Sequence, residues 1–139
     1  MNPLVSEWIE KAEGDFATAG RELRARKSPN YDAVCFHSQQ CAEKYLKAIL
    51  QESNILFGRT HNLTSLLDIL VTGRERLEYL RPLLLRLGEY AVNVRYPGEI
   101  ADRDSAKEAF GICRDLREQA QAVLKVSKSK QVKSSERKR

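Results

Sequence analysis

The sequence predicts an all-α protein, an up-and-down bundle of four main helices plus a short helix. Apolar residues recur at spacings of three and four along most of the chain, which is the period of one helical face. No segment alternates apolar and polar residues as a half-buried strand does. The composition is 42% hydrophobic and 31% charged, with only 4 Pro and 7 Gly among 139 residues, as in a globular chain. This length predicts one domain.

Two long helices are expected at the start of the chain. The first covers residues 3–26, because Pro3 after Asn2 suits a first helical position and because seven apolar residues share one face: Val5, Trp8, Ile9, Ala12, Phe16, Ala19 and Leu23. The Ser-Pro-Asn sequence at 28–30 ends this helix. The second helix runs to about Ser53 and has its own stripe: Val34, Cys35, Ser38, Cys41, Ala42, Tyr45, Leu46 and Ile49.

The middle of the chain predicts a loop, a short helix and a further long helix. Residues 54–61 contain Gly58 and no helical stripe, so they are expected to form a loop. Asn62 is then placed to cap a short helix, which Gly73 ends. Leu77 and Leu80 indicate one more helical turn. Pro82 is expected in the first turn of the next helix, since proline inside a helix removes a hydrogen bond. The Arg-Tyr-Pro-Gly sequence at 95–98 ends that helix.

The last helix is expected to begin near Ser105. Ser105 and Glu108 have the spacing of a capping box, in which two side chains satisfy backbone amides at a helix start. Its buried stripe is Ala109, Phe110, Cys113, Leu116, Ala120 and Val123.

The net charge of +5 belongs to the end of the chain. Residues 125–139 contain seven basic residues and one acidic residue, so they carry +6, whereas residues 1–124 carry −1. We therefore expect a helical domain over 1–124 and a basic, disordered tail over 125–139. Such a tail either binds nucleic acid or anionic lipid nonspecifically or serves only to keep the protein soluble.

Composition and motifs exclude several classes of protein. The three cysteines, Cys35, Cys41 and Cys113, form no CxxC pair and are expected to be small buried hydrophobes rather than disulfide or zinc ligands. His37 and Cys41 are four residues apart, but two isolated ligands rarely make a metal site, so no metal is expected. No Walker loop or Rossmann glycine motif is present, so no cofactor is expected. No apolar run is long enough to cross a membrane, so a cytoplasmic protein is expected.

Polar residues of the second helix form the first candidate site. Glu43 and Lys47 are four residues apart in the favourable order for a helical ion pair. Such pairs usually lie on a solvated face. The alternative is that Lys44 or Lys47 faces a phosphate group.

Two short segments form the second candidate. His61 lies between Thr60 and Asn62 at a helix entrance, where backbone amides favour an anion, although a purely local capping role is the alternative. Arg95 can grip a phosphate in a bidentate manner, and Tyr96 offers an aromatic face and a hydroxyl. The alternative for Arg95 is hydrogen bonding to the last carbonyls of its own helix.

These segments together resemble the HEPN domain family in order and spacing. The resemblance covers about residues 4–124 and is carried by four motifs: Trp8 with Ala12 and Asp15; the sequence from Phe36 to Ala48; Thr60-His61-Asn62-Leu63; and Arg95-Tyr96-Pro97. It implies a helical bundle, usually homodimeric and often encoded beside a minimal nucleotidyltransferase as a toxin–antitoxin pair.

Many HEPN proteins are metal-independent ribonucleases that use an arginine followed after four to six residues by a histidine at the dimer cleft. This sequence lacks that motif, because Ile100, Ala101 and Asp102 occupy the histidine positions after Arg95. RNA cleavage without metal needs a group that transfers protons near neutral pH, for which histidine is suited. His61 is able to take this role only if folding brings it beside Arg95.

The sequence therefore favours a HEPN-type dimer that binds a nucleotide or RNA phosphate and acts with a nucleotidyltransferase partner. In this hypothesis Arg95 holds the phosphate, Tyr96 stacks or hydrogen-bonds, and the same cleft is lined by Thr60, His61, Lys44 and Lys47. One alternative is a ribonuclease toxin with a nonstandard site built on Arg95 and His61. The other is a noncatalytic interaction module. Tyr90 and Tyr96 are candidate anchors of the dimer interface.

Overall fold

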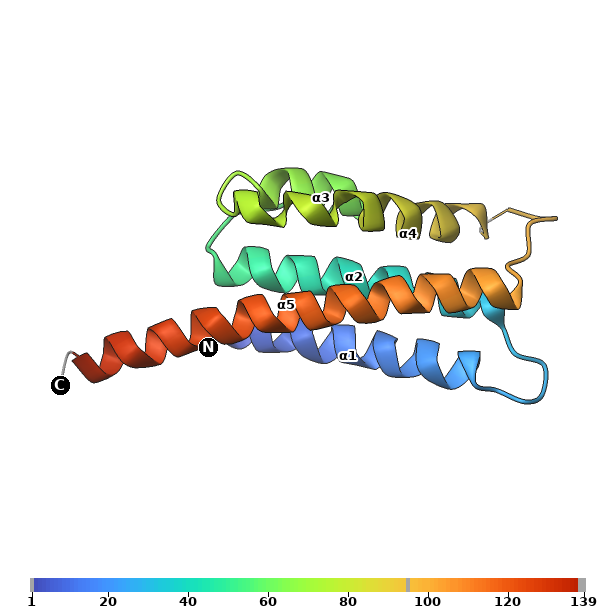
Figure 1. Ribbon diagram of the computed structural model, residues 1–139, viewed down its shortest axis with the longest axis horizontal. Coiled ribbons are helices and arrows are strands. Elements are labelled where there is room, and N and C mark those ends of the chain that lie inside the picture. The colour runs from blue at the N-terminus through green and yellow to red at the C-terminus, as the bar shows by residue number, and fades with distance from the viewer. Residues whose placement is uncertain (1, 95, 138–139) are drawn as a thin grey trace.

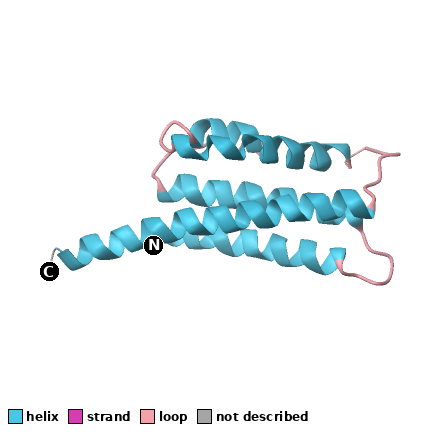
Figure 2. Ribbon diagram, in the orientation of Figure 1, coloured by secondary structure: helices cyan, strands magenta, loops and turns pink. Residues whose placement is uncertain are grey.

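The protein is an antiparallel bundle of helices. The computed structural model describes the backbone of residues 2–94 and 96–137 and the side chains of residues 2–94 and 96–125. Successive long helices run in opposite directions (Figure 1). The described residues contain no strand (Figure 2). The elements are α1 (Pro3–Leu23), α2 (Tyr31–Glu52), α3 (Leu63–Leu70), the 3₁₀ helix η1 (Glu75–Leu80), α4 (Arg81–Asn93) and α5 (Arg103–Arg137). The predicted fold class is confirmed.

Helix α2 is the centre of the core, because it packs against α1, α3, α4 and α5. Tyr45, Ile49 and Leu50 of α2 are almost completely buried. They meet Leu66 and Leu70 of α3 in one apolar cluster that also includes Leu84 and Leu87 of α4. Each such side chain contributes roughly 1.5–3 kcal/mol when it is fully buried. Because α2 is surrounded, its polar residues also lie close to other elements.

Asparagine side chains cap the starts of three helices. Asn2 accepts a hydrogen bond from the N–H of Leu4, Asn30 from Ala33, and Asn62 from Ser65, at 2.9–3.0 Å. The predicted caps and proline positions at α1, α3 and α4 are thus found.

Gly73 does not end α3 in the way the sequence predicts. The C-cap is Val71, in a right-handed conformation. The glycine serves packing instead, since a Cβ at Gly73 would lie 3.2 Å from Cδ1 of Ile55.

The predicted capping box at Ser105 and Glu108 is wrong. Helix α5 begins at Arg103, and Oδ1 of Asp102 accepts a 2.7 Å hydrogen bond from the N–H of Ser105. Backbone and side-chain hydrogen bonds with Ser105 lower the pKa of Asp102. Glu108 instead pairs with Arg86 of α4 and accepts a 2.6 Å hydrogen bond from Tyr90. A long-range arginine therefore takes the carboxylate that a local cap would have used.

The structure also differs from the sequence prediction at the end of the chain. Helix α5 continues to residue 137 and extends past the other helices, whereas disorder is predicted after residue 124 (Figure 1). Residues 125–137 contain no proline or glycine, and extending an existing helix is far easier than starting a new one. None of the described helices is both long and apolar enough to cross a membrane.

Candidate functional site

A pocket of about 440 Å³ lies between α4 and the start of α3. One residue of α2, Gln39, completes it. Its walls are mostly apolar, with a few amide, hydroxyl and acidic groups, which is typical of small-molecule sites. The lining residues are Gln39, His61, Asn62, Leu63, Thr64, Leu84, Leu85, Gly88, Glu89, Ala91, Val92 and Asn93.

His61 is the predicted site residue that lines this pocket. Its backbone is fixed, because the Gln39 side chain donates a 3.1 Å hydrogen bond to the His61 carbonyl oxygen. On either side of it, Thr60 Oγ1 accepts from the N–H of Asn62 at 3.2 Å, and Asn62 caps α3. The His61 side chain remains 71% exposed. The capping role of this segment and its place at a pocket are therefore compatible.

A buried carboxylate orients the imidazole of His61. Nδ1 of His61 lies 3.2 and 3.3 Å from the two carboxylate oxygens of Glu43, whose side chain is only 3% exposed. A carboxylate only accepts hydrogen bonds, so Nδ1 carries a proton and Nε2 is the free nitrogen of a neutral ring. Glu43 thus defines which nitrogen of His61 is available to a ligand.

Lys47 shares the Glu43 carboxylate but lies inside the protein. Its Nζ is 3.2 Å from Oε2 of Glu43, and its side chain is 6% exposed. The Trp8 ring covers the amine, with 5.3 Å from Nζ to the ring centroid, and Phe57 packs against Trp8 at 6.2 Å. The predicted Glu43–Lys47 ion pair is present, but the predicted solvated face is not. Lys47 reaches His61 only through Glu43 and does not line the pocket.

Lys44 belongs to a separate cluster between α1 and α2. Its Nζ forms an ion pair with Oδ2 of Asp15, and Nδ1 of His37 lies 2.8 Å from Oδ1 of the same carboxylate. His37 therefore has a carboxylate partner. Among the described side chains, no group of three or more His, Cys, Asp or Glu residues is arranged to hold a metal ion.

The cysteines are buried and unpaired, as the sequence predicts for small hydrophobic residues. Burial raises the pKa of Cys35 to about 11. A hydrogen bond with Cys113, together with burial, raises the pKa of Cys41. Neither thiol is therefore a nucleophile at neutral pH.

The C-terminal end of α4 forms one wall of the pocket, up to Asn93. Two residues later stands Arg95, which lies outside the described residues. The following turn is closed by a 3.1 Å hydrogen bond from the N–H of Glu99 to the carbonyl oxygen of Tyr96, and it requires Gly98 at a φ of +91°. The Tyr96 side chain is 63% exposed.

Tyr90, the other predicted interface anchor, is engaged within the chain. Its hydroxyl donates to Glu108 at 2.6 Å and accepts from Arg86 at 3.2 Å. Burial and the hydrogen bond to Glu108 raise the pKa of Tyr90.

Of the predicted site residues, the structure places His61 at the pocket. Thr60 is adjacent to it in sequence, Lys44 and Lys47 lie elsewhere, and Arg95 is outside the described residues. Sequence reasoning missed Gln39 and Asn93 as lining residues of the pocket, and it named Glu43 only as the ion-pair partner of Lys47. Gln39 and Glu43 stand in the polar motif of α2, so the motif itself was the signal, but only folding shows that they turn toward His61.

The chain belongs to the HEPN domain family. The HEPN domain model matches residues 5–126, nearly all of the bundle just described.

Among its relatives, the chain is 35% identical over 96 residues to the protein named "Putative toxin MJ1304" of Methanocaldococcus jannaschii. That match covers 65% of this chain and 61% of the relative, so the chain spans about three-fifths of the relative's length. Two solved structures share the fold at 24% identity. TT1696 from Thermus thermophilus has a TM-score of 0.69 over 88% of this chain and 99% of that one. ST0689, described as an archaeal HEPN homologue, has a TM-score of 0.64 over 85% and 95%.

Proposed function

We propose that this HEPN protein is toxin-like and binds a nucleotide or RNA phosphate in the pocket between α4 and the start of α3. It acts with a minimal nucleotidyltransferase partner. Membership of the HEPN family and the similarity to a protein named as a toxin support the general class. The ligand is argued from the site, whereas the partner is what the resemblance to the HEPN family implies.

The observation that carries the ligand is the position of His61. It stands at a pocket of ligand size, immediately before the N-terminus of α3, where free backbone N–H groups and the helix dipole favour an anion. The facing wall ends at Asn93, two residues before Arg95. Arg95 then supplies a bidentate phosphate contact, and Tyr96 a stacking or hydrogen-bonding surface. The apolar wall of α4, with Leu85 and Val92, contacts the base or the sugar.

Thermal protection tests this site. Nucleoside mono- and triphosphates and a short RNA are added to the wild-type protein and to the variants His61→Ala and Arg95→Ala, and the melting temperature is followed. His37→Ala is the matched control, because His37 is the other histidine and pairs with Asp15 away from the pocket. We expect protection in wild type and in the control and at least a tenfold weaker affinity in the two site variants. Protection by none of the ligands would leave a pure interaction module.

Partnership is tested in cells. Expression of the chain alone is expected to arrest growth, and co-expression of its minimal nucleotidyltransferase partner is expected to restore growth. The proposal also includes a homodimer. Its candidate contacts are large exposed side chains: Leu85 and Val92 at the rim of the pocket, and Tyr96 in the turn after α4. Light scattering coupled to gel filtration measures the molecular mass of the protein in solution and so distinguishes a dimer from a monomer. A monomer would remove this part of the proposal.

A second candidate function is metal-independent RNA cleavage with His61 as the general base. The observation that favours it is the hydrogen bond to Glu43, since a histidine with a fixed tautomer and a free Nε2 is prepared to accept a proton. The assay is cleavage of labelled RNA in excess chelator. It predicts a bell-shaped pH profile that disappears in His61→Ala and a changed profile in Glu43→Gln. Absence of cleavage by wild type would leave binding as the function.

A further inference from the structure

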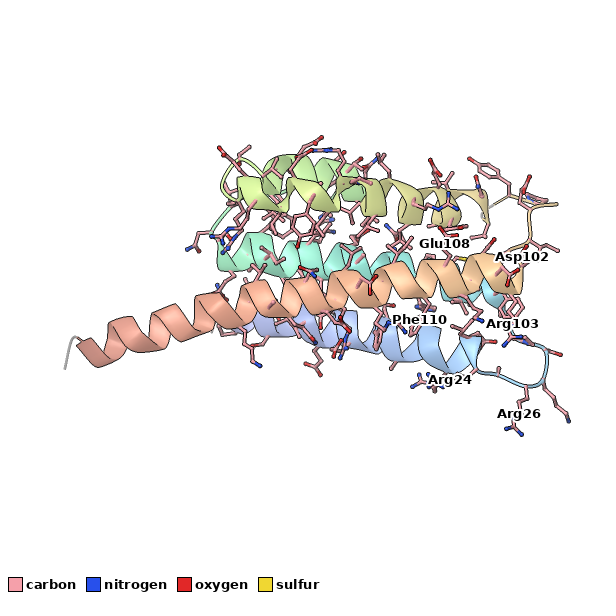
Figure 3. All side chains as sticks on the ribbon, in the orientation of Figure 1. Arg24, Arg26, Asp102, Arg103, Glu108 and Phe110 are labelled. Atoms are coloured by element: carbon pink, nitrogen blue, oxygen red, sulfur yellow. The ribbon has the colours of Figure 1, made fainter. Side chains whose placement is uncertain are left out.

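A set of basic side chains gathers where α1 and α5 meet. Arg24 follows α1, and Arg26 and Lys27 lie in the next turn. Figure 3 shows Arg24, Arg26 and Arg103 at the same end of the bundle. On α5, Arg103 is followed by Lys107 and Arg114 at spacings of four and seven, which keeps the three on one helical face. We call these residues the basic strip: Arg24, Arg26, Lys27, Arg103, Lys107 and Arg114.

Gly20 brings the two parts of the strip together. A Cβ at this position would lie 3.0 Å from Nη1 of Arg24 and 3.4 Å from Cζ of Phe110. The guanidinium of Arg24 and the ring of Phe110 therefore both lie beside Gly20 of α1. Phe110 comes three residues after Lys107 and four before Arg114, so Arg24 lies beside the basic face of α5.

The cations of the strip are available to a ligand. All six are exposed, and none forms an ion pair with any carboxylate whose side chain the structure describes. Other arginines do form ion pairs with carboxylates: Arg81 pairs with Asp68, Arg86 with Glu108, and Arg117 with Glu13.

Nearby carboxylates have backbone partners. Glu22 accepts from the N–H of Asn30 at 2.6 Å, and Asp32 accepts from Ala101 at 2.8 Å. Asp102 caps α5. Acidic residues of α5 lie to one side of this face, toward α4, where Glu108 pairs with Arg86: Asp104, Glu108 and Asp115. Glu118 follows Arg114 at a spacing of four, so it lies on the face itself, beyond the end of the strip. Residues 1–124 carry a net charge of only −1, so the strip reflects segregation of charge rather than an overall excess of positive charge.

We propose that the basic strip binds the phosphate backbone of an RNA chain. This inference rests on the proposed function, because it extends the ligand of the pocket from one nucleotide to a polynucleotide. From Arg103 to Arg114 the strip runs about 16 Å along α5, at 1.5 Å per residue, which is longer than a single phosphate contact. The pocket wall ends at Asn93 of α4 and the strip begins at Arg103 of α5, at the same end of the bundle (Figure 1). A strand that leaves the pocket at this end is the ligand proposed for these cations.

The test compares two double variants of the full chain. Arg26→Ala/Arg103→Ala removes two cations of the strip. Lys11→Ala/Arg76→Ala is the matched control, since it removes two other exposed cations that have no ion pair among the described side chains. Both variants keep residues 125–139, so any binding by those residues is common to them. Melting curves establish that both are folded.

Binding of a labelled 12-nucleotide single-stranded RNA is measured by fluorescence anisotropy at several salt concentrations. We expect the strip variant to bind about tenfold more weakly at low salt, with a log–log salt slope reduced by about 1.4, and the control to match wild type. Equal effects in both variants, or none, would overturn the proposal. So would tighter binding of labelled polyglutamate than of RNA through the same two cations, because the strip would then serve an acidic protein.

The same samples separate this inference from the pocket. Binding of adenosine monophosphate should be unchanged in the strip variant and lost in His61→Ala. If RNA binding depends on the strip while no nucleotide binds the pocket in wild type, the strip stands and the proposed pocket ligand fails. If nucleotide binds but RNA binds no more tightly than the nucleotide, the strip proposal fails alone.

Discussion

Replacing Lys47 with methionine should destabilise the protein severely. The Lys47 and Glu43 side chains are 6% and 3% exposed, and their charges face each other at 3.2 Å. Methionine fills most of the volume of lysine but carries no charge. Among the described residues, the buried Glu43 carboxylate would then keep only the exposed His61 as a partner.

The burial of each ion pair allows the loss in free energy of unfolding to be ranked. Removing one partner of a buried ion pair costs about 3–5 kcal/mol, because the remaining charge loses its compensation. That corresponds to a fall of roughly 10–15 °C in melting temperature for a chain of this size. Lys44→Met is the comparison, since Lys44 and Asp15 are more exposed, at 21% and 11%, and its loss should cost about 1 kcal/mol. The double variant Glu43→Gln/Lys47→Met should regain most of the stability, since it leaves no uncompensated charge.

Urea denaturation followed by circular dichroism measures these differences, with the slope of the transition checked for a change in the unfolded state. The expected order of stability is wild type, then Lys44→Met, with Lys47→Met lowest. A loss below about 1 kcal/mol in Lys47→Met would show that water reaches the pair. The argument that Trp8 and Phe57 exclude solvent would then be refuted.

Three further outcomes are expected from the same measurement. Gly98→Ala should lower the free energy of unfolding by about 1 kcal/mol, because a φ of +91° strains any L side chain. Gly14→Ala, in open space on α1, should raise the free energy of unfolding by about 0.5–1 kcal/mol, and the reverse order of the two variants would contradict the backbone geometry. Ser38→Ala should raise the free energy of unfolding by about 1 kcal/mol, since its buried Oγ has no hydrogen-bond partner among the described residues, and a clear loss would indicate a bound water. Arg117 lowers the pKa of Glu13 below its ordinary 4.5, so this carboxylate stabilises the fold above pH 4.5 and loses that effect as the pH falls through the lowered pKa. The difference in stability between wild type and Glu13→Gln should therefore shrink on acidification, and a constant difference from about pH 7 to about pH 2 would contradict this.

The helices could be predicted from sequence because their signals are local. Apolar spacing, asparagine caps and Pro82 each act within one or two turns. The structure places the corresponding elements within a few residues of their predicted bounds, except at the end of α5, which continues to residue 137. The prediction failed where a distant residue competes. Glu108 was available for a cap, but Arg86, 22 residues earlier in the chain, binds it.

The site was predictable as a set of residue types rather than as an arrangement. His61 and the motif of α2 could be selected from sequence, because polar residues in fixed spacing stand out against an apolar stripe. The contacts between these residues could not be predicted from sequence. The loop before α3 folds back so that Phe57 packs against Trp8 and His61 meets Glu43, which turns an apparently exposed lysine into a buried one. Loop closure of this kind depends on tertiary packing, which no local pattern encodes.

Trp8 gives this protein a built-in optical probe. It is the only tryptophan in the chain, and its indole contacts both the Lys47 amine and Phe57, which belongs to the same loop as His61. Its emission therefore reports the environment of that loop without any label, while the basic strip is placed along α1 and α5 at the other end of α1. A titration watched through intrinsic fluorescence would sense a ligand that moves the loop. The anisotropy of a labelled RNA would sense both surfaces, so the two signals together assign each binding event to its place.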